Sequence, residues 1–242
     1  MIKAVTFDLD HTLFDRHATL RAVTPALRRR FPTDPALSDD EIASLWVYAD
    51  DRYVYDGWRY ILAYLEQNRV FTAPVDYAEY RAFVFENFAK TAVPFPFALP
   101  MLHVLKQRGY KVGLITNGQH ALQYKKLELT GMRYVFDEII VSGDVLVEKP
   151  DPEIFYMMCE KLGVEPAEMV YVGDNPVNDV GGAQKAGCRT IWIRSTRVDS
   201  GACTPDEMAN DVREIPLLVE EMQREEKTEN PGTGTAREDG GE

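Results

Sequence analysis

The sequence has few cysteines, and their spacing fits neither a metal site nor a set of disulfides. Cys159, Cys188 and Cys203 are odd in number and contain no Cys-x-x-Cys pair. Such usage is typical of unpaired thiols in a reducing compartment. The first residues lead straight into an expected strand, without the basic and apolar segments of a signal peptide. We therefore expect a cytoplasmic protein.

Positive charge and long apolar runs are also scarce. The chain has 27 Lys and Arg residues against 39 Asp and Glu residues, a net charge of −12. An acidic surface repels the phosphates of a nucleic acid, and the one basic run, Arg28-Arg29-Arg30, would spread around a helix. No apolar run approaches the roughly 20 residues that span a bilayer. We expect neither a nucleic-acid nor a membrane partner, and the sequence carries no signal for an oligomeric state.

Residues 16–93 carry helix signals and no convincing strand. Ser38-x-x-Glu41 has the form of a capping box, and apolar residues spaced three and four apart follow it. Asp76 is placed to cap a further helix. About four helices are expected, enough for a small bundle. We predict an inserted helical-bundle cap domain over residues 16–93.

Strands and helices alternate through the rest of the chain. The expected strands are the run from Ile2, followed by 111–116, 138–141, 169–172 and 190–193. Strands with few polar residues between amphipathic helices indicate a parallel sheet that is covered on both faces. The predicted fold class is α/β, with a Rossmann-like, doubly wound core over residues 1–15 and 94–222. Residues 223–242 have almost no large apolar side chain and are predicted to form a disordered acidic tail.

Two acids follow the first strand. Asp8 and Asp10 are two residues apart, so their side chains can project to the same side as the chain leaves the sheet. Two carboxylates this close are unfavourable unless a cation lies between them or one stays protonated. The alternative is an ordinary surface turn in which Asp10 caps a helix.

Further polar residues follow the other strands of the predicted sheet. Thr116 and Asn117 follow the second strand, Lys149 follows the third, and Asp174 and Asp179 follow the fourth. Each alone fits a common turn, a helix cap or an exposed lysine. Ligands of open parallel sheets bind at the carboxyl ends of the strands. Together, these residues predict a metal-assisted site for an anionic substrate.

Four stretches carry a resemblance to a known family. They are FDLDHTLFD at 7–15, ITNG at 115–118, EKPDPEIF at 148–155 and VGDNPVNDVGGAQKAG at 172–187. In this order they resemble the motifs of the haloacid dehalogenase-like (HAD) superfamily, in the branch with a helical cap inserted after the first motif. The resemblance spans residues 1 to about 220.

The resemblance implies a role for each motif residue. Asp8 would be the nucleophile that becomes an aspartyl phosphate, and Asp10 would be the general acid and base. Mg²⁺ would be held by the Asp8 side chain, the Asp10 backbone carbonyl and Asp174. Thr116, the backbone near Asn117 and Lys149 would bind the phosphoryl oxygens. Asp179 would orient Lys149 and the ligands of the metal.

Single residues distinguish the expected reaction from other reactions of the superfamily. Members that dehalogenate carbon lack an acid at the position of Asp10. Phosphonate hydrolases of the capped type need a cap lysine, and residues 16–93 contain only Lys90, at their far edge. The expected function is hydrolysis of a small phosphomonoester. A sugar phosphomutase remains an alternative, and so does a non-enzymatic module that binds a phosphorylated ligand or a protein.

The substrate depends on the cap, where polarity and position give five candidates: His17, Arg52, Tyr55, Trp58 and Arg59. Aromatic and arginine side chains could favour a nucleotide or a compact sugar phosphate. Helical spacing already explains the positions of the cap aromatics, so most of them are expected to fill the core of the bundle or its contact with the rest of the protein.

Overall fold

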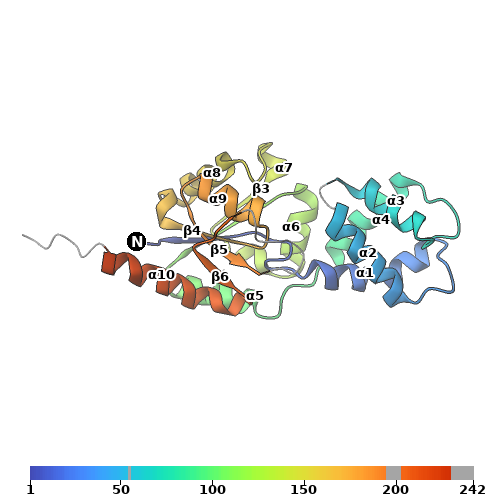
Figure 1. Ribbon diagram of the computed structural model, residues 1–242, viewed down its shortest axis with the longest axis horizontal. Coiled ribbons are helices and arrows are strands. Elements are labelled where there is room, and N and C mark those ends of the chain that lie inside the picture. The colour runs from blue at the N-terminus through green and yellow to red at the C-terminus, as the bar shows by residue number, and fades with distance from the viewer. Residues whose placement is uncertain (54–55, 195–202, 230–242) are drawn as a thin grey trace, which may run out of the picture.

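The computed structural model describes residues 1–53, 56–194 and 203–229, with side chains up to Glu225. Two parts lie side by side along its long axis (Figure 1). One is an α/β part that contains the sheet. The other, which we call the helical block, consists of the helices α1 to α4 (Figure 1).

The sheet has six parallel strands in the order β3-β2-β1-β4-β5-β6. Their bounds are β1 Ala4–Phe7, β2 Lys111–Thr116, β3 Glu138–Val141, β4 Met169–Gly173, β5 Arg189–Ile193 and β6 Glu207–Ala209. The predicted parallel sheet is confirmed. Strand β6 was not expected, because three residues beginning with Glu207 are too short to show a strand pattern.

Helices cover both faces of the sheet, so the doubly wound fold is also confirmed. In β1, Val5 and Phe7 belong to the core that contains the apolar residues of α5 and α10, whereas Ala4 belongs to the core under α8. This division follows from the alternation of side chains along a strand. The helices of this part are α5 Ala98–Gln107, α6 His120–Leu129, α7 Ser142–Val145, α8 Pro152–Leu162, α9 Gly182–Lys185 and α10 Ile215–Glu229.

The helical block has its own apolar core, with Trp46 and Tyr80 fully buried at its centre. Its helices are α1 Arg16–Arg30, α2 Asp39–Tyr53, α3 Trp58–Gln67 and α4 Tyr77–Lys90. The expected capping box is present: Ser38 N donates to Glu41 Oε2 at 2.7 Å, and Glu41 N donates to Ser38 Oγ at 3.2 Å. Asp76 caps α4 by accepting from Glu79 N at 2.9 Å.

The chain leaves the α/β part and returns to it through two adjacent segments. Asp15 N donates to Val93 O at 2.8 Å, and Phe95 N donates to Leu13 O at 2.9 Å. These bonds join the two linkers, and the helices between them enclose a separate core. We therefore propose the boundaries at residues 15/16 and 93/94 for a core domain and an inserted cap domain.

The predicted tail needs a correction at its start. Helix α10 continues past Met222 to Glu229, so residues 223–229 are helical. Met222 is buried in the sheet core, and the residues after it are mostly strong helix formers that can propagate a helix already anchored by packing. Residues 230–242 lie outside the described part. Among the described helices, none has the length and apolarity needed to cross a membrane.

A buried ion pair joins the first two helices of the block. Arg16 donates from Nε to Asp50 Oδ2 at 2.6 Å and from a terminal nitrogen to Asp50 Oδ1 at 2.7 Å. Asp50 is 0% exposed and Arg16 is 7% exposed. The Arg16 guanidinium also lies over the Phe88 ring, 4.7 Å from its centroid. This pair fixes α1 against α2 and, through Phe88, against α4.

We expect Asp50→Asn to lower the free energy of unfolding by about 3–5 kcal/mol, because it removes the buried charge partner of Arg16 on α2. Urea unfolding measures the change. Asp39→Asn is the matched control, since Asp39 pairs with Arg28 at the surface at 2.6 Å and should cost no more than about 1 kcal/mol. Equal losses in the two variants would contradict the assignment.

Candidate active site

A small hollow lies at the carboxyl ends of β1, β2 and β4, where the strand order reverses. Its volume is about 120 Å³, and it is lined by Asp8, Asp10, His11, Arg16, Thr116, Asn117, Lys149, Asp174, Asn175, Asn178 and Asp179. A larger cleft of about 750 Å³ adjoins it and is lined from both parts of the molecule. Ligand sites of this fold class are found at this position. The structure thus brings together all the residues that the strand ends predicted.

Asp8 follows directly on β1 and lies at the bottom of the hollow. Its backbone N donates to Val172 O on β4 at 2.9 Å, which extends the pairing of the two strands. The residue is 8% exposed. Burial raises the pKa of Asp8 to about 6, and the charge of Asp179 adds to the rise, although Lys149 opposes it.

Lys149 reaches the same hollow from the loop between α7 and α8. Its Nζ donates to Asp8 Oδ1 at 2.6 Å, to Asp179 Oδ1 at 2.7 Å and to the Tyr171 hydroxyl at 2.9 Å. Burial alone would lower the pKa of Lys149, but Asp179 and Asp8 outweigh burial and raise the pKa well above its usual value. Lys149 is therefore a fixed positive charge beside Asp8.

Three carboxylates gather beside this lysine. Ligand oxygens of Asp8, Asp174 and Asp179 all lie within 4.8 Å of one another, and the three residues are buried. Asp179 is already engaged: Oδ1 accepts from Lys149 and Oδ2 accepts from Asn175 N at 2.9 Å. A Cβ at Gly173 would overlap the Asp179 side chain, so only glycine lets the loop close this tightly. An excess of buried carboxylate oxygens is a donor set suited to Mg²⁺.

Thr116 and Asn117 end β2 next to the hollow. The Thr116 hydroxyl accepts from Gln123 Nε2 at 2.6 Å. The Asn117 side chain holds the lysine loop, because it donates to Lys149 O at 3.0 Å and accepts from Lys149 N at 2.9 Å. The side chain of Asn117 therefore positions Lys149, and Asn117 is also among the residues that line the hollow.

Two polar residues of α6 hold Asp10, and the sequence reasoning missed both. Lys126 Nζ donates to both carboxylate oxygens of Asp10 at 2.8 Å, and Gln123 Nε2 donates to Asp10 Oδ2 at 3.2 Å. Burial would raise the pKa of Asp10, but Lys126 and Arg16 outweigh burial and hold the pKa well below its usual range. Gln123 and Lys126 are three residues apart on one helix face beside the apolar Leu127, a spacing that could have identified them.

The structure places the predicted cap residues at different sites. Trp58 lines the large cleft. Arg52 is exposed, and its guanidinium lies 5.7 Å from the Tyr53 ring centroid. Arg59 stacks on Tyr77 at 4.3 Å and lines a separate hollow. The structure therefore brings Trp58 to the cleft and leaves Arg52 and Arg59 away from it.

Two further candidates differ in another way. His17 does not line the cleft; its Nε2 lies 2.8 Å from Asp51 Oδ1. Tyr55 lies outside the described residues. The sequence reasoning missed Arg81 and Phe85 of α4, which line the cleft with Trp58. The sequence gives no sign that these two residues line the cleft, because they reach it through the packing of α4 against α6.

The sequence was compared with protein families and with known proteins, and the matches are to hydrolases and phosphatases. A family profile described as haloacid dehalogenase-like hydrolase matches residues 5–193. A glyceraldehyde 3-phosphate phosphatase of Methanopyrus kandleri is 34% identical over 201 residues, 80% of this chain and 84% of that protein. A phosphoserine phosphatase of Thermus thermophilus is 30% identical over 249 residues, 89% of this chain and 98% of that protein.

Solved structures give the same result. The crystal structure of a HAD phosphatase from Thermococcus onnurineus is 30% identical, with a TM-score of 0.61, and the match covers 90% of this chain and 98% of that one. The profile match, the similarity to two named phosphatases over most of their length and the common fold all lead to one assignment. This chain belongs to the haloacid dehalogenase-like hydrolase family and is an enzyme of the phosphatase type.

Proposed function

We propose that this enzyme is a Mg²⁺-dependent phosphomonoester hydrolase that works through an aspartyl phosphate on Asp8. The observation that carries the proposal is the convergence of Asp8, Asp10, Thr116, Lys149 and Asp174 on one small hollow. A nucleophile, a second acid, a fixed cation and a carboxylate set for a divalent metal are the groups that phosphoryl transfer requires.

In the first step, a carboxylate oxygen of Asp8 attacks phosphorus and the bond to the leaving oxygen breaks. Asp10 gives a proton to that oxygen, so an alcohol leaves and a phosphoryl group remains on Asp8. Lys149 and the Thr116 hydroxyl bind phosphoryl oxygens in this proposal as charge develops on them. Asn117 keeps Lys149 in place through its two bonds to the lysine backbone.

In the second step, water attacks the phosphoryl group on Asp8. Asp10, now ionised, takes a proton from this water, and inorganic phosphate leaves with Asp8 restored. The contacts of Asp10 suit the base form, because Lys126 and Arg16 stabilise its negative charge. A phosphomonoester that enters the hollow brings negative charge, which raises the pKa of Asp10 toward the acid form needed for the first step.

Asp8, Asp174 and the backbone carbonyl of Asp10 are the groups we assign to hold the metal. Asp179 is engaged by Lys149 and Asn175 N and orients this set. When bound, Mg²⁺ supplies positive charge that shields Asp8 from an anionic substrate and stabilises the transferring phosphoryl group. The carboxylates of Asp8, Asp174 and Asp179, with a single lysine among them, are consistent with a bound divalent cation.

The large cleft beside the hollow is where the rest of the substrate would lie. It holds about 750 Å³, and Trp58, Arg81 and Phe85 line it from the helical block. An arginine and two aromatic rings suit a small molecule with a second polar or charged group. The relatives named above are phosphatases of glyceraldehyde 3-phosphate and phosphoserine. We propose a small phosphorylated metabolite of this size, a compact sugar phosphate, a phospho-amino acid or a nucleotide.

We expect Asp8→Asn to reduce phosphate release by at least about a thousandfold, because the amide is a poor nucleophile. Phosphate would be measured from glyceraldehyde 3-phosphate, phosphoserine, a hexose phosphate and a nucleoside monophosphate, with Mg²⁺ and with a chelator. Asp151→Asn is the control, since Asp151 caps α8 beside the same motif and Asn caps equally well.

Two results would contradict the proposal. Appreciable release by a folded Asp8→Asn variant would remove Asp8 as the nucleophile. Conversion of a sugar phosphate into its isomer, without net release of phosphate, would identify a phosphomutase.

Mg²⁺ affinity should depend on pH through Asp8. Its pKa of about 6 in the metal-free protein means that binding must displace a proton below that pH. We expect the apparent affinity to fall about tenfold for each pH unit below 6 and to level off above about 7. Titration calorimetry at several pH values measures this. In Asp8→Asn the affinity should be weaker and nearly independent of pH in this range; an unchanged slope would contradict the assignment.

Lys126→Met should lower kcat by about ten- to a hundredfold, because Asp10 loses the cation that orients it and holds it ionised. Removing this positive charge raises the pKa of Asp10. The acid limb of the kcat profile, where the base must be ionised, should therefore move to higher pH. Lys125→Met is the matched control, since Lys125 is the exposed neighbour on the same helix. A lower kcat with an unshifted pH profile would leave Lys126 a structural role only.

A further inference from the structure

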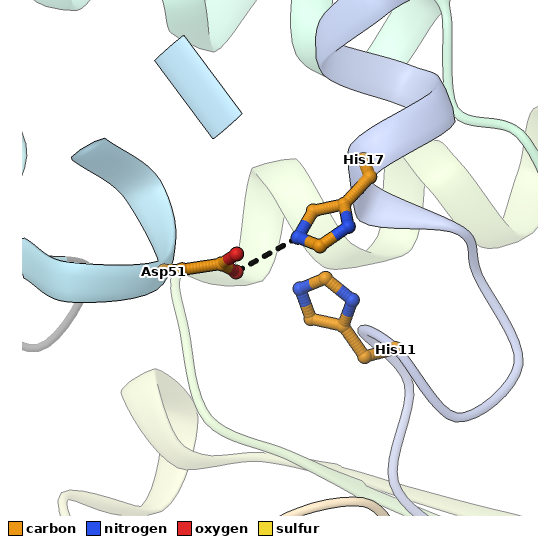
Figure 2. A group of neighbouring side chains, drawn as sticks. All are labelled: His11, His17 and Asp51. Carbon is orange, nitrogen blue, oxygen red and sulfur yellow. Dashed lines mark hydrogen bonds and ion pairs between the residues drawn. The ribbon is translucent and has the colours of Figure 1, made fainter. Parts of the chain in front are cut away.

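A second group of side chains of the types that bind metals lies on the helical-block side of the loop that follows β1. It consists of His11 in the loop, His17 on α1 and Asp51 on α2 (Figure 2). Each offers a ligand atom, and the three atoms lie within 4.8 Å of one another. We call these residues the histidine cluster. They share no residue with the acidic group of Asp8, Asp174 and Asp179.

The side chains of the cluster face a common point. Figure 2 shows one ring nitrogen of each histidine on the side that faces the Asp51 carboxylate. His17 Nε2 lies 2.8 Å from Asp51 Oδ1. The two imidazole rings meet edge to face, with their centroids 4.8 Å apart and an interplanar angle of 76°. Zinc needs each ligand atom at about 2 Å, so side-chain rotation would have to bring the three atoms around the ion.

The backbone at each residue of the histidine cluster is held by contacts with residues outside the cluster. His11 has a φ of 64°, which is uncommon for a residue with a side chain, and its N donates to Phe14 O at 2.7 Å. The buried Arg16–Asp50 ion pair lies one residue before both His17 and Asp51. The same pair that joins α1 to α2 therefore places His17 opposite Asp51, and a preformed arrangement lowers the cost of binding.

The donor set indicates which ion would bind. Two imidazoles and one carboxylate suit zinc and its neighbours in the first transition series, whereas Mg²⁺ prefers oxygen ligands. Three protein ligands leave a coordination position for water. The His17 and Asp51 side chains are 30% and 27% exposed, so an ion can reach them from solvent.

We propose that the histidine cluster binds one divalent transition-metal ion of the zinc class, at a site separate from that of Mg²⁺. The ion would tie the loop that carries Asp10 to both α1 and α2. It would therefore limit the movement of the helical block relative to the catalytic hollow. The proposal does not depend on the substrate or on the reaction assigned above.

The test uses Co²⁺ as a spectroscopic probe, because bound Co²⁺ absorbs visible light with an intensity that depends on its geometry. The full chain would be stripped of metal, saturated with Mg²⁺ and titrated with Co²⁺; Zn²⁺ would then be added as a competitor. We expect one Co²⁺ ion per chain, a nitrogen-ligand spectrum, and displacement by Zn²⁺ but not by further Mg²⁺.

Ligand variants locate the site. His17→Gln, Asp51→Asn and His11→Asn should each weaken Co²⁺ binding at least about tenfold. Asparagine is chosen at position 11 because it tolerates a positive φ. Thermal unfolding of each metal-free variant checks that it is folded, and three independent variants keep the test decisive if one fails.

His120→Gln is the matched control. His120 Nδ1 lies 2.8 Å from Asp144 Oδ2 at the surface, and no second histidine or third ligand joins this pair among the groups found in the described residues. This variant should bind Co²⁺ like the original chain. The proposal is overturned if no Co²⁺ binds in the presence of Mg²⁺. Binding unchanged in His17→Gln and Asp51→Asn would also overturn it, as would binding lost in Asp174→Asn.

Discussion

The burial of like charges is the constraint on which the site depends. Asp8, Asp174 and Asp179 come together below the surface at the carboxyl ends of β1 and β4. Such a group can persist only with compensating positive charge or with one carboxyl protonated. Lys149 supplies one charge by direct bonds to Asp8 and Asp179. Burial still raises the pKa of Asp8 to about 6, which supports the divalent cation proposed for this position.

Arg16 connects this electrostatics to the helical block. It pairs with Asp50 inside the block, lies 3.9 Å from an Asp10 oxygen, and stacks over Phe88. Lys126, from the α/β part, lies over the same Phe88 ring at 5.4 Å. Cations from both parts of the molecule therefore stabilise the negative charge of Asp10. The position of the block and the charge state of Asp10 therefore depend on the same contacts.

Local sequence patterns were enough for most of the architecture. Alternating strands and helices predicted the parallel sheet, and the Ser38-x-x-Glu41 box predicted the start of α2, because each is set by short-range backbone chemistry. The predictions of secondary structure were wrong at two places where tertiary packing determines whether an element forms. Strand β6 exists because β5 offers it a parallel edge, and α10 continues into the expected tail because Met222 anchors it in the core.

The sequence by itself determined which acids, lysine and hydroxyl lie at the sheet edge, since strand ends and chain order fix that edge. Only the tertiary structure decided what those groups contact. Gln123 and Lys126 reach Asp10 because α6 packs beside the residues that follow β1 and end β2. Arg81 and Phe85 reach the cleft because α4 packs against α6. His17 and Asp51 meet through the ion pair between α1 and α2, and the loop after β1 brings His11 beside them. Residues far apart in the chain carry no local pattern that relates them, so their proximity is a property of packing alone.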